Sequence, residues 1–376
     1  MLRPLIRLTF VLVIAAMTAV FAARVIGDAQ PPRAWLTWEA SGTNGVLDIY
    51  LWDNRRIVNL TRDPEGWEFD FAWSYDGRLA WQTQHLDTND VYIWDGSIHA
   101  LTRYADTPYA TKDGTLAWSH DGRLAWAIST AGESSNEVYQ WDGTAIRHVC
   151  LSPGRVLDLM WSADGRLAWT FEVNETRGIL VWDGRDDCLN IGSTVSYNPV
   201  WSADGRLAFM RREAEGESEI YVWDGENTLN ISQHPNRDSD PRWLADGRLE
   251  WSSGLPGSGD IYSWDGESVV SRHLETSPRH IVHESSPDGR WRWEYDRSRS
   301  LVFSIWEGDT PVLVDQPLAV GGFDLPNWSP EGRLAWGWSN ARDIYGVAVW
   351  DEQGIFMAAA PGLDLIARLE WSPPMN

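Results

Sequence analysis

The stretch AWSYDGRLAW at 72–81, followed by DVYIWDG at 90–96, recurs along the chain and decides the fold. Six clear copies of the second phrase and two weaker ones place their tryptophans at 52, 94, 141, 182, 223, 264, 306 and 350. Steps of 41 to 47 residues separate these tryptophans. A repeat of this length is typical of the blades of a β-propeller, in which each unit supplies four short strands.

Each repeat predicts two β-hairpins. Trp-Ser-x-Asp-Gly-Arg is a polar turn between short apolar runs, and the alternating Ile-Tyr-x-Trp run ends in Asp-Gly, which favours a tight turn. The first phrase occurs seven times, and the chain supplies the halves of an eighth copy as AWLTWEA (34–40) and LEWSPP (369–374). We therefore predict an all-β, eight-bladed β-propeller over 34–374, with four-stranded antiparallel blades and the last strand of the chain in the first blade.

Composition limits the function. The 376 residues include 54 Asp and Glu against 31 Lys and Arg, a net charge of −23, so the chain is a poor partner for a phosphate backbone. Of the 26 tryptophans, 22 occupy three positions per repeat, which predicts packing between neighbouring blades. The four outside this register are candidates for an exposed contact surface: Trp35, Trp67, Trp291 and Trp338.

Residues 1–23 are membrane-directed, because Arg3 and Arg7 precede an uncharged apolar run at 8–23. We predict one N-terminal hydrophobic helix that serves as a signal anchor or as a cleaved signal peptide. As a helix the run would rise roughly 24 Å, which is short for a membrane span and long for a signal peptide, so its length leaves both possibilities open. A short linker at 24–33 would follow, and the body would be translocated.

The phrase Trp-Ser-x-Asp-Gly-Arg-Leu-Ala-Trp followed by Ile-Tyr-x-Trp-Asp-Gly resembles the TolB-like propeller repeat, a relative of the Trp-Asp repeat propellers. The resemblance covers nearly all of 34–374. The chain departs from the TolB pattern because it has eight units in place of six and no separate α/β domain is expected in it. It implies a binding platform on the extracytoplasmic side of a bacterial cell envelope, and such propellers also occur beside hydrolase domains.

Loop lengths separate the two faces of the predicted ring. The turns inside the two phrases keep a nearly constant length, whereas the connections after the second and fourth strands vary and emerge together, so we expect the binding surface there. Asp70, Asp158, Asn198 and Asp240 each lie three residues before an inner-strand tryptophan, near this mouth of the channel. With Trp67 and Trp338 they are the candidate partner-binding residues. They could instead hold Ca²⁺, or simply cap the strand starts as solvated side chains.

Two pairings of side chains are also predicted. The turn arginines, such as Arg78, begin second strands, and the acids that end third strands, such as Asp95, should face them across the ladder. Cys150 ends one outer strand and Cys188 begins the next, and export would permit a disulfide. Because outer strands diverge and the two cysteines should lie toward opposite faces, the argument disfavours the bridge without excluding it. His280 and His283 should point to opposite faces of a strand and form no metal pair.

These observations favour a non-enzymatic binding or scaffold propeller, without cofactor, metal or catalytic residues. It would be monomeric, anchored or secreted, and would engage an envelope protein, a peptide or a cell-wall polymer that is basic or neutral. The alternatives are an enzyme, quinoprotein-like or hydrolase-associated, and a Ca²⁺-dependent propeller. Against the enzyme, the chain has neither an adjacent cysteine pair nor a Gly-x-Ser-x-Gly sequence.

Overall fold

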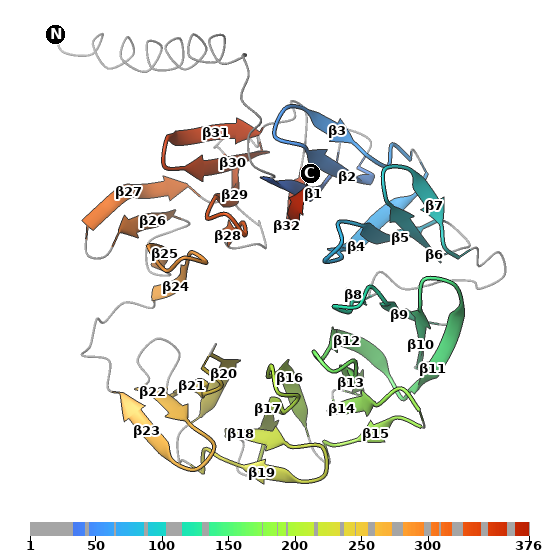
Figure 1. The fold of residues 1–376 in the computed structure, drawn as a ribbon, viewed down its shortest axis with the longest axis vertical. Coiled ribbons are helices and arrows are strands. Elements are labelled where there is room, and N and C mark those ends of the chain that lie inside the picture. The colour runs from blue at the N-terminus through green and yellow to red at the C-terminus, as the bar shows by residue number, and fades with distance from the viewer. Residues whose placement is uncertain are drawn as a thin grey trace. The chain divides into compact units, whose positions relative to one another are not determined.

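A computed structural model describes residues 33–375 except 42–44, 64, 86–88, 103–114, 130–134, 175, 186, 193–194, 214–216, 234–236, 245, 255–259, 273–280, 297–301, 308–309, 318–325, 340–344 and 359–364. One compact unit spans Ala34–Met375. Eight four-stranded sheets follow one another around a ring in this unit, which is the predicted eight-bladed propeller (Figure 1). The predicted N-terminal helix lies outside the described residues, within which no helix long and apolar enough to cross a membrane occurs.

Blades are numbered along the chain, and their strands are given from the channel outward. Blade 1 contains β32 (Leu365–Met375), β1 (Arg33–Ser41), β2 (Leu47–Trp52) and β3 (Ile57–Asn59). Blade 2 contains β4 (Trp67–Trp73), β5 (Leu79–Gln84), β6 (Asn89–Trp94) and β7 (Ile98–Ala100). Blade 3 contains β8 (Leu116–Trp118), β9 (Leu124–Ser129), β10 (Asn136–Trp141) and β11 (Ile146–Ser152). Blade 4 contains β12 (Arg155–Trp161), β13 (Leu167–Val173), β14 (Thr176–Trp182) and β15 (Leu189–Asn190).

The second half of the ring has the same order. Blade 5 contains β16 (Ser196–Trp201), β17 (Leu207–Arg212), β18 (Ser218–Trp223) and β19 (Thr228–Asn230). Blade 6 contains β20 (Asp238–Trp243), β21 (Leu249–Ser253), β22 (Asp260–Trp264) and β23 (Val269–Arg272). Blade 7 contains β24 (Ile281–Ser285), β25 (Trp291–Asp296), β26 (Val302–Glu307) and β27 (Thr310–Pro317). Blade 8 contains β28 (Asn327–Trp328), β29 (Leu334–Ser339), β30 (Tyr345–Asp351) and β31 (Gly354–Ala358).

Blade 1 closes the ring with both ends of the chain. Its sheet has the order β3-β2-β1-β32, so the last strand lies beside the first, as predicted. The Trp35 backbone N–H donates to Ser372 Oγ at 2.8 Å, which ties the two halves of the interrupted repeat together. This closure covers the inner edge of the first strand with the last one, so β1 is paired on both sides.

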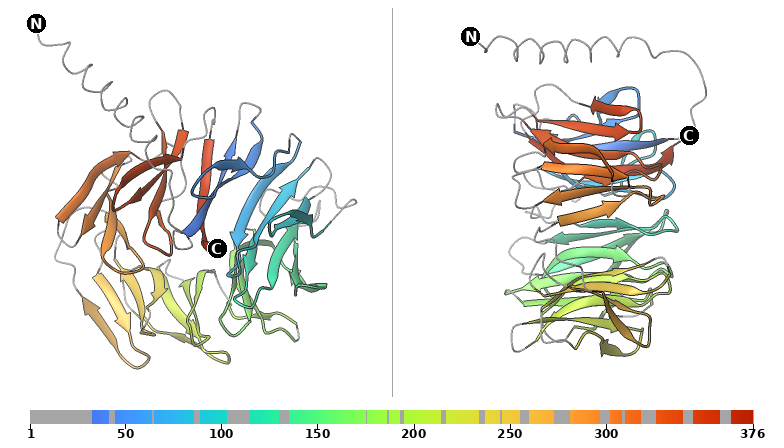
Figure 2. Two further views of the ribbon diagram at one scale, coloured as in Figure 1. Left: turned by 45° about the horizontal axis from the view of Figure 1, so that its top comes forward. Right: turned by 90° about the vertical axis from the view of Figure 1, so that its left-hand side faces the viewer.

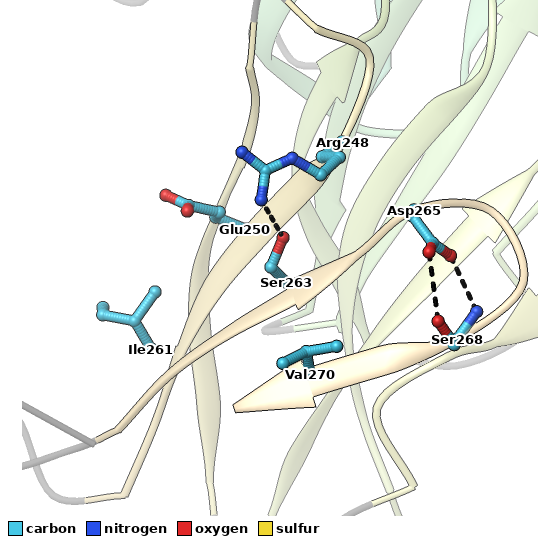
Figure 3. A pocket seen from close by; sticks show the side chains of 7 residues that line it. All are labelled: Arg248, Glu250, Ile261, Ser263, Asp265, Ser268 and Val270. Carbon is cyan, nitrogen blue, oxygen red and sulfur yellow. Dashed lines mark hydrogen bonds between the residues drawn. The ribbon is translucent and has the colours of Figure 1, made fainter. Parts of the chain in front are cut away.

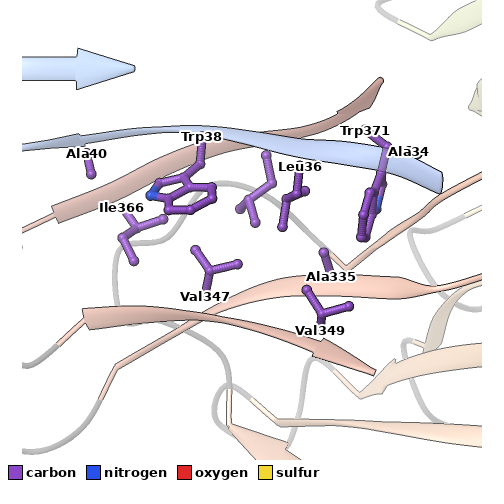
Figure 4. Packing of buried hydrophobic residues seen from close by; sticks show 10 residues of the cluster. Ala34, Leu36, Trp38, Ala40, Ala335, Val347, Val349, Ile366 and Trp371 are labelled. Atoms are coloured by element: carbon purple, nitrogen blue, oxygen red, sulfur yellow. The ribbon is translucent and has the colours of Figure 1, made fainter. Parts of the chain in front are cut away.

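Tryptophans from the second strand of seven blades, and Phe209 in blade 5, form the core between blades. The largest fully buried side chains include seven of them: Trp38, Trp81, Trp126, Trp169, Trp251, Trp293 and Trp336. All but Trp293 lie in a cluster with the preceding blade. Several also stack on an aromatic ring of their own blade, as Trp81 does on Tyr92, whose ring centroid lies 5.7 Å away. Figure 4 shows the cluster of this kind that joins blades 8 and 1 around Trp38. The packing role predicted for the register tryptophans is thereby confirmed.

The Ser-x-Asp-Gly-Arg turn is held by its own side chains. In blade 2, Ser74 Oγ accepts the backbone N–H of Arg78 at 2.8 Å, and Arg78 Nε donates to Asp76 at 2.9 Å. Asp76 also accepts a hydrogen bond from Ser74 Oγ. Partial burial acts to raise the pKa of Asp76, but the hydrogen bonds from Arg78 and Ser74 hold this pKa below its usual range. Gly77 takes a φ of +85°, which is open to glycine at little cost.

The predicted ladder pairing of Arg78 with Asp95 is wrong. Arg78 pairs with Asp76 of its own turn, while Asp95 accepts the backbone N–H of Ser97 at 3.3 Å. The same division recurs in blade 3, where Asp142 accepts the N–H groups of its own turn. An acid two residues away in a tight turn is closer to the guanidinium than an acid across the ladder that is already bound to backbone donors.

Candidate functional site

The two faces of the ring differ in their loops. The strands run between these faces in the edge-on view of Figure 2. Because consecutive strands in a blade are antiparallel, the turns after the first and third strands lie on one face, here called the constant-turn face. The connections after the second and fourth strands lie on the other, the variable-loop face. Many residues of these connections are outside the described residues.

Four of the predicted site residues, Asp70, Asp158, Asn198 and Asp240, lie within the inner strands, at the point where the strand register breaks. The pairing shifts between Phe69 and Ala72 in blade 2, and corresponding shifts occur in blades 4, 5 and 6. Asp70, Asn198 and Asp240 have φ angles of 51°, 52° and 57°. Asp and Asn tolerate this left-handed conformation better than most residues, so a β-bulge accounts for the residue types that the sequence repeats.

Asp70 is engaged within the ring. Its carboxylate accepts the backbone N–H of Leu116 in blade 3 at 2.6 Å and binds Arg368 of blade 1. Its own backbone N–H donates to Glu39 at 3.1 Å. Burial raises the pKa of Asp70, against the lowering effect of Arg368. Asp70 therefore links three consecutive blades around the channel and presents little of its carboxylate to solvent.

Asp158, Asn198 and Asp240 are exposed at the same position of three consecutive blades. Asn198 Nδ2 contacts Met210 Sδ at 3.6 Å, and Ser239 Oγ donates to Asp240 at 3.0 Å. The three side chains are thus exposed midway along the innermost strands of blades 4, 5 and 6, and not at the mouth of the channel where the sequence placed them. Within the part of the chain that the structure describes, no three carboxylate, histidine or cysteine side chains gather closely enough to hold a metal ion.

The four tryptophans outside the register differ in exposure. Trp67 is 44% exposed at the start of β4, on the variable-loop face, as the prediction of a contact residue requires. Trp338 is partly covered and lies over Gly346, where a Cβ atom would come within 2.7 Å of the indole ring. Trp35 packs against Trp94 at 5.6 Å between ring centroids. Trp291 is buried against blade 8, so its predicted exposure is wrong.

Sequence reasoning missed a buried acid beside Trp67. Glu68 is 1% exposed and its Oε2 has no hydrogen-bond partner. Burial, with the negative charges of Asp48, Asp63 and Glu39, raises the pKa of Glu68 to about 9. At neutral pH this carboxyl is therefore protonated. The signal in the sequence is weak: the position five residues before the inner-strand tryptophan is apolar at Val156 and Ile366 but polar at Ser196 and Asp238, and all four are buried.

Cys150 and Cys188 form a disulfide, with their Cα atoms 6.4 Å apart. The expectation that they lie toward opposite faces is wrong. Cys150 pairs with Val138 within β11, and Cys188 directly precedes β15 of the next blade. Because blades are twisted, the end of one outer strand approaches the start of its neighbour. The bridge links blades 3 and 4 beside the apolar cluster that joins them.

Comparison with solved structures finds propellers of low sequence identity. The structure of two prolyl endopeptidases has a TM-score of 0.53 and 12% identity, and the match covers 83% of this chain and 51% of that chain. The β-propeller domain of the trilobed protease from Pyrococcus furiosus has a TM-score of 0.48 and 14% identity over 79% of this chain and 96% of that one. TolB from Acinetobacter baumannii has a TM-score of 0.40 and 16% identity over 81% of each chain.

No family model matches the chain, and no curated protein matches it. The chain spans about half the length of the prolyl endopeptidase chain that it resembles. At 12% identity the likeness to the prolyl endopeptidase structure concerns the fold alone.

Proposed function

We propose that the protein is an extracytoplasmic, non-enzymatic binding propeller that engages its partner through the variable-loop face. The observation that carries this proposal is the contrast between the tryptophans buried between blades and the exposed polar side chains of the inner strands. Trp67 is exposed at the start of β4, and Asp158, Asn198 and Asp240 are exposed within the innermost strands of blades 4, 5 and 6. Binding residues on loops and strand ends of a rigid scaffold are the usual arrangement in such folds.

The disulfide supports an extracytoplasmic location. Structural disulfides persist in oxidising compartments and are rare in the cytosol. The bridge joins two blades and both sulfurs are partly covered by the cluster around Trp169, as in a structural bridge. Together with the apolar run at 8–23, this favours a body outside the cytoplasm, either anchored or released.

The charge of the chain supports a basic or neutral partner. Asp158 and Asp240 add two exposed carboxylates to the innermost strands of a protein whose net charge is −23. Long-range attraction accelerates the encounter with a cation and repels an acidic surface. A lysine- or arginine-containing segment of an envelope protein is the partner that fits best.

A role beside a hydrolase is the second candidate. The chain resembles the prolyl endopeptidase structure in fold, and this match is the reason to test a role beside a hydrolase. The full chain would then act with a hydrolase carried on another chain. Labelling the purified protein with a fluorophosphonate serine probe tests for catalysis within the chain, and stable labelling would replace the binding proposal by the enzyme.

Site-specific photo-crosslinking in the producing cells tests the binding proposal. A benzophenone amino acid replaces Trp67 on the variable-loop face or Tyr75, which is 68% exposed in the constant turn of the same blade. Both substitutions exchange one exposed aromatic ring for another, so they are matched in chemistry. We expect a discrete protein adduct from position 67 and none from position 75. An adduct from position 75 alone would overturn the assignment of the face.

A further inference from the structure

A row of buried polar side chains lies at the variable-loop end of blade 2, on its side toward blade 1. Glu68, Thr83 and Asp90 pair in register across β4, β5 and β6, and they are 1%, 2% and 8% exposed. In blade 4 the residues of the same row carry no charge, namely Val156, Phe171 and Gly178. Blade 2 therefore buries polar groups at positions where uncharged residues are compatible with the same fold.

Glu68 shares this junction with carboxylates from the side of blade 1. Glu39 lies in β1, Asp48 in β2, and Asp63 in the connection from β3 to β4. Burial, and then the negative charges of these acids, raise the pKa of Glu68 to about 9, so its carboxyl holds a proton at neutral pH. Among the described residues, Glu68 Oε2 has no hydrogen-bond partner. The carboxyl is thus kept neutral by a proton and not by a basic side chain.

The connection that precedes Trp67 packs directly against this row. Asp63 Oδ1 accepts the backbone N–H groups of Glu65 and Gly66, both at 3.0 Å. A Cβ atom on Gly66 would come within 2.8 Å of Cγ2 of Thr83, the side chain in the middle of the row. The exposed side chains of Glu65 and Trp67 therefore belong to the segment that covers the buried carboxyl on the variable-loop face.

Acidic side chains outnumber basic ones around Glu68. Among the described residues of the elements that pack around it, the acids are Glu39, Asp48, Asp63, Glu65, Asp70, Asp90 and Glu370. The basic side chains are Arg62, His85 and Arg368. Of these, Arg62 is exposed, and the other two each contact an acid of the set. A further positive charge at this surface would favour the ionised form of Glu68, because it offsets the repulsion between the carboxylates.

The acids of the cavity in blade 6 differ from Glu68 in this respect. Figure 3 shows this cavity, of about 380 Å³, with Glu250 and Asp265 in its lining. Glu250 accepts a hydrogen bond from Arg242 Nη2, and Asp265 accepts the backbone N–H of Ser268, both at 2.8 Å. These acids have donors of their own where they lie, whereas Glu68 depends on its proton.

We propose that a lysine or arginine side chain of the partner binds over Glu68, against Trp67 and Glu65, and releases the proton that Glu68 holds. This inference rests on the proposed function, because it places the basic partner at one point of the variable-loop face. The ring of Trp67 is 44% exposed and offers a cation–π contact, and the carboxylate of Glu65 offers a charge-assisted hydrogen bond. The proton passes to solvent as the Glu68 carboxylate forms, so binding strengthens as pH rises.

Calorimetric titration of the full chain with tetralysine at low salt, between pH 6 and pH 8.5, tests this exchange. Wild type is compared with Glu68→Gln, which has no proton to release. We expect equal affinities near pH 6 and several-fold tighter binding by the wild type at pH 8.5, since one released proton changes the affinity by at most about tenfold per pH unit. Every histidine is present in both proteins, so any contribution from histidine cancels. Equal affinities at every pH, or no binding of tetralysine by the wild type, would overturn the proposal.

The number of protons released provides a second readout. It follows from the binding enthalpies measured at pH 8 in Hepes and in Tris, which differ in their own ionisation enthalpies. We expect more proton release from the wild type than from Glu68→Gln, and the wild-type value from Glu226→Gln, which removes an exposed acid of the constant-turn face. Glu68→Val, with the residue of blade 4, serves as the comparison if the glutamine variant does not fold. A photo-crosslinked adduct from position 67 together with equal proton release by wild type and Glu68→Gln would retain the binding face and refute the exchange.

Discussion

Glu68→Gln should remove a pH dependence of stability that the buried carboxyl imposes. The pKa of Glu68 is about 9 in the folded chain, against an ordinary value of 4.5. Between these values the folded state holds a proton that the unfolded state releases, so stability falls as pH rises from the unfolded pKa toward the folded one. Each pH unit in this window costs about 1.4 kcal/mol, so the interval from pH 5 to pH 8 costs on the order of 4 kcal/mol.

The assay is urea denaturation of wild type and variant at pH 5, 6, 7 and 8, monitored by tryptophan fluorescence. Glutamine has nearly the same shape and cannot ionise, so the variant should match the wild type near pH 5 and exceed its free energy of unfolding increasingly toward pH 8. Glu226→Gln, in an exposed turn of blade 5, removes the same charge without burial and serves as the control. The reasoning is refuted if the free energies of wild type and Glu68→Gln run parallel over this pH range.

Three further predictions concern the frame. Reduction of the Cys150–Cys188 bridge, which closes a separation of 38 residues, should lower the free energy of unfolding by ~2–4 kcal/mol, measured as the urea midpoint with and without dithiothreitol. Trp169→Ala should cost ~3–5 kcal/mol because the ring is fully buried between blades 3 and 4, whereas Trp67→Ala should stay within about 0.5 kcal/mol in the same titration. Asp240→Val forces a β-branched residue to a φ of 57° and should lower the melting temperature, while Asp240→Asn should leave it nearly unchanged.

The repeat predicted the fold because the same pattern of buried residues recurs in eight units. AWLTWEA and LEWSPP are informative only as halves of one phrase, and the structure joins them at Trp35 and Ser372. The alternation of apolar residues determines which side chains enter the core, so the buried tryptophans followed directly. Trp291 is the exception, because it replaces the leucine that begins the second strand in other blades and inherits that residue's burial.

Contacts between repeats were harder to predict than contacts within them. The partner of Arg78 depends on which of two acids lies within reach, and the phrase contains both. The approach of Cys150 to Cys188 depends on the twist between neighbouring blades, which the repeat length in the sequence does not reveal. Sequence identified Asp70, Asn198 and Asp240 as one class through their common position. It could not distinguish Asp70, which Arg368 covers, from the two that remain exposed.

The yield of photo-crosslinked partner from position 67 tests the central claim, binding through the variable-loop face, most directly. It is measured with Asp158→Asn and Asp240→Asn together, which neutralise two exposed acids of the innermost strands β12 and β20. The matched control combines Glu226→Gln and Glu267→Gln, which neutralise two exposed acids of the constant-turn face. The account predicts a several-fold loss of adduct with the first pair and an unchanged yield with the second. An unchanged yield with the first pair and a loss with the second would contradict it.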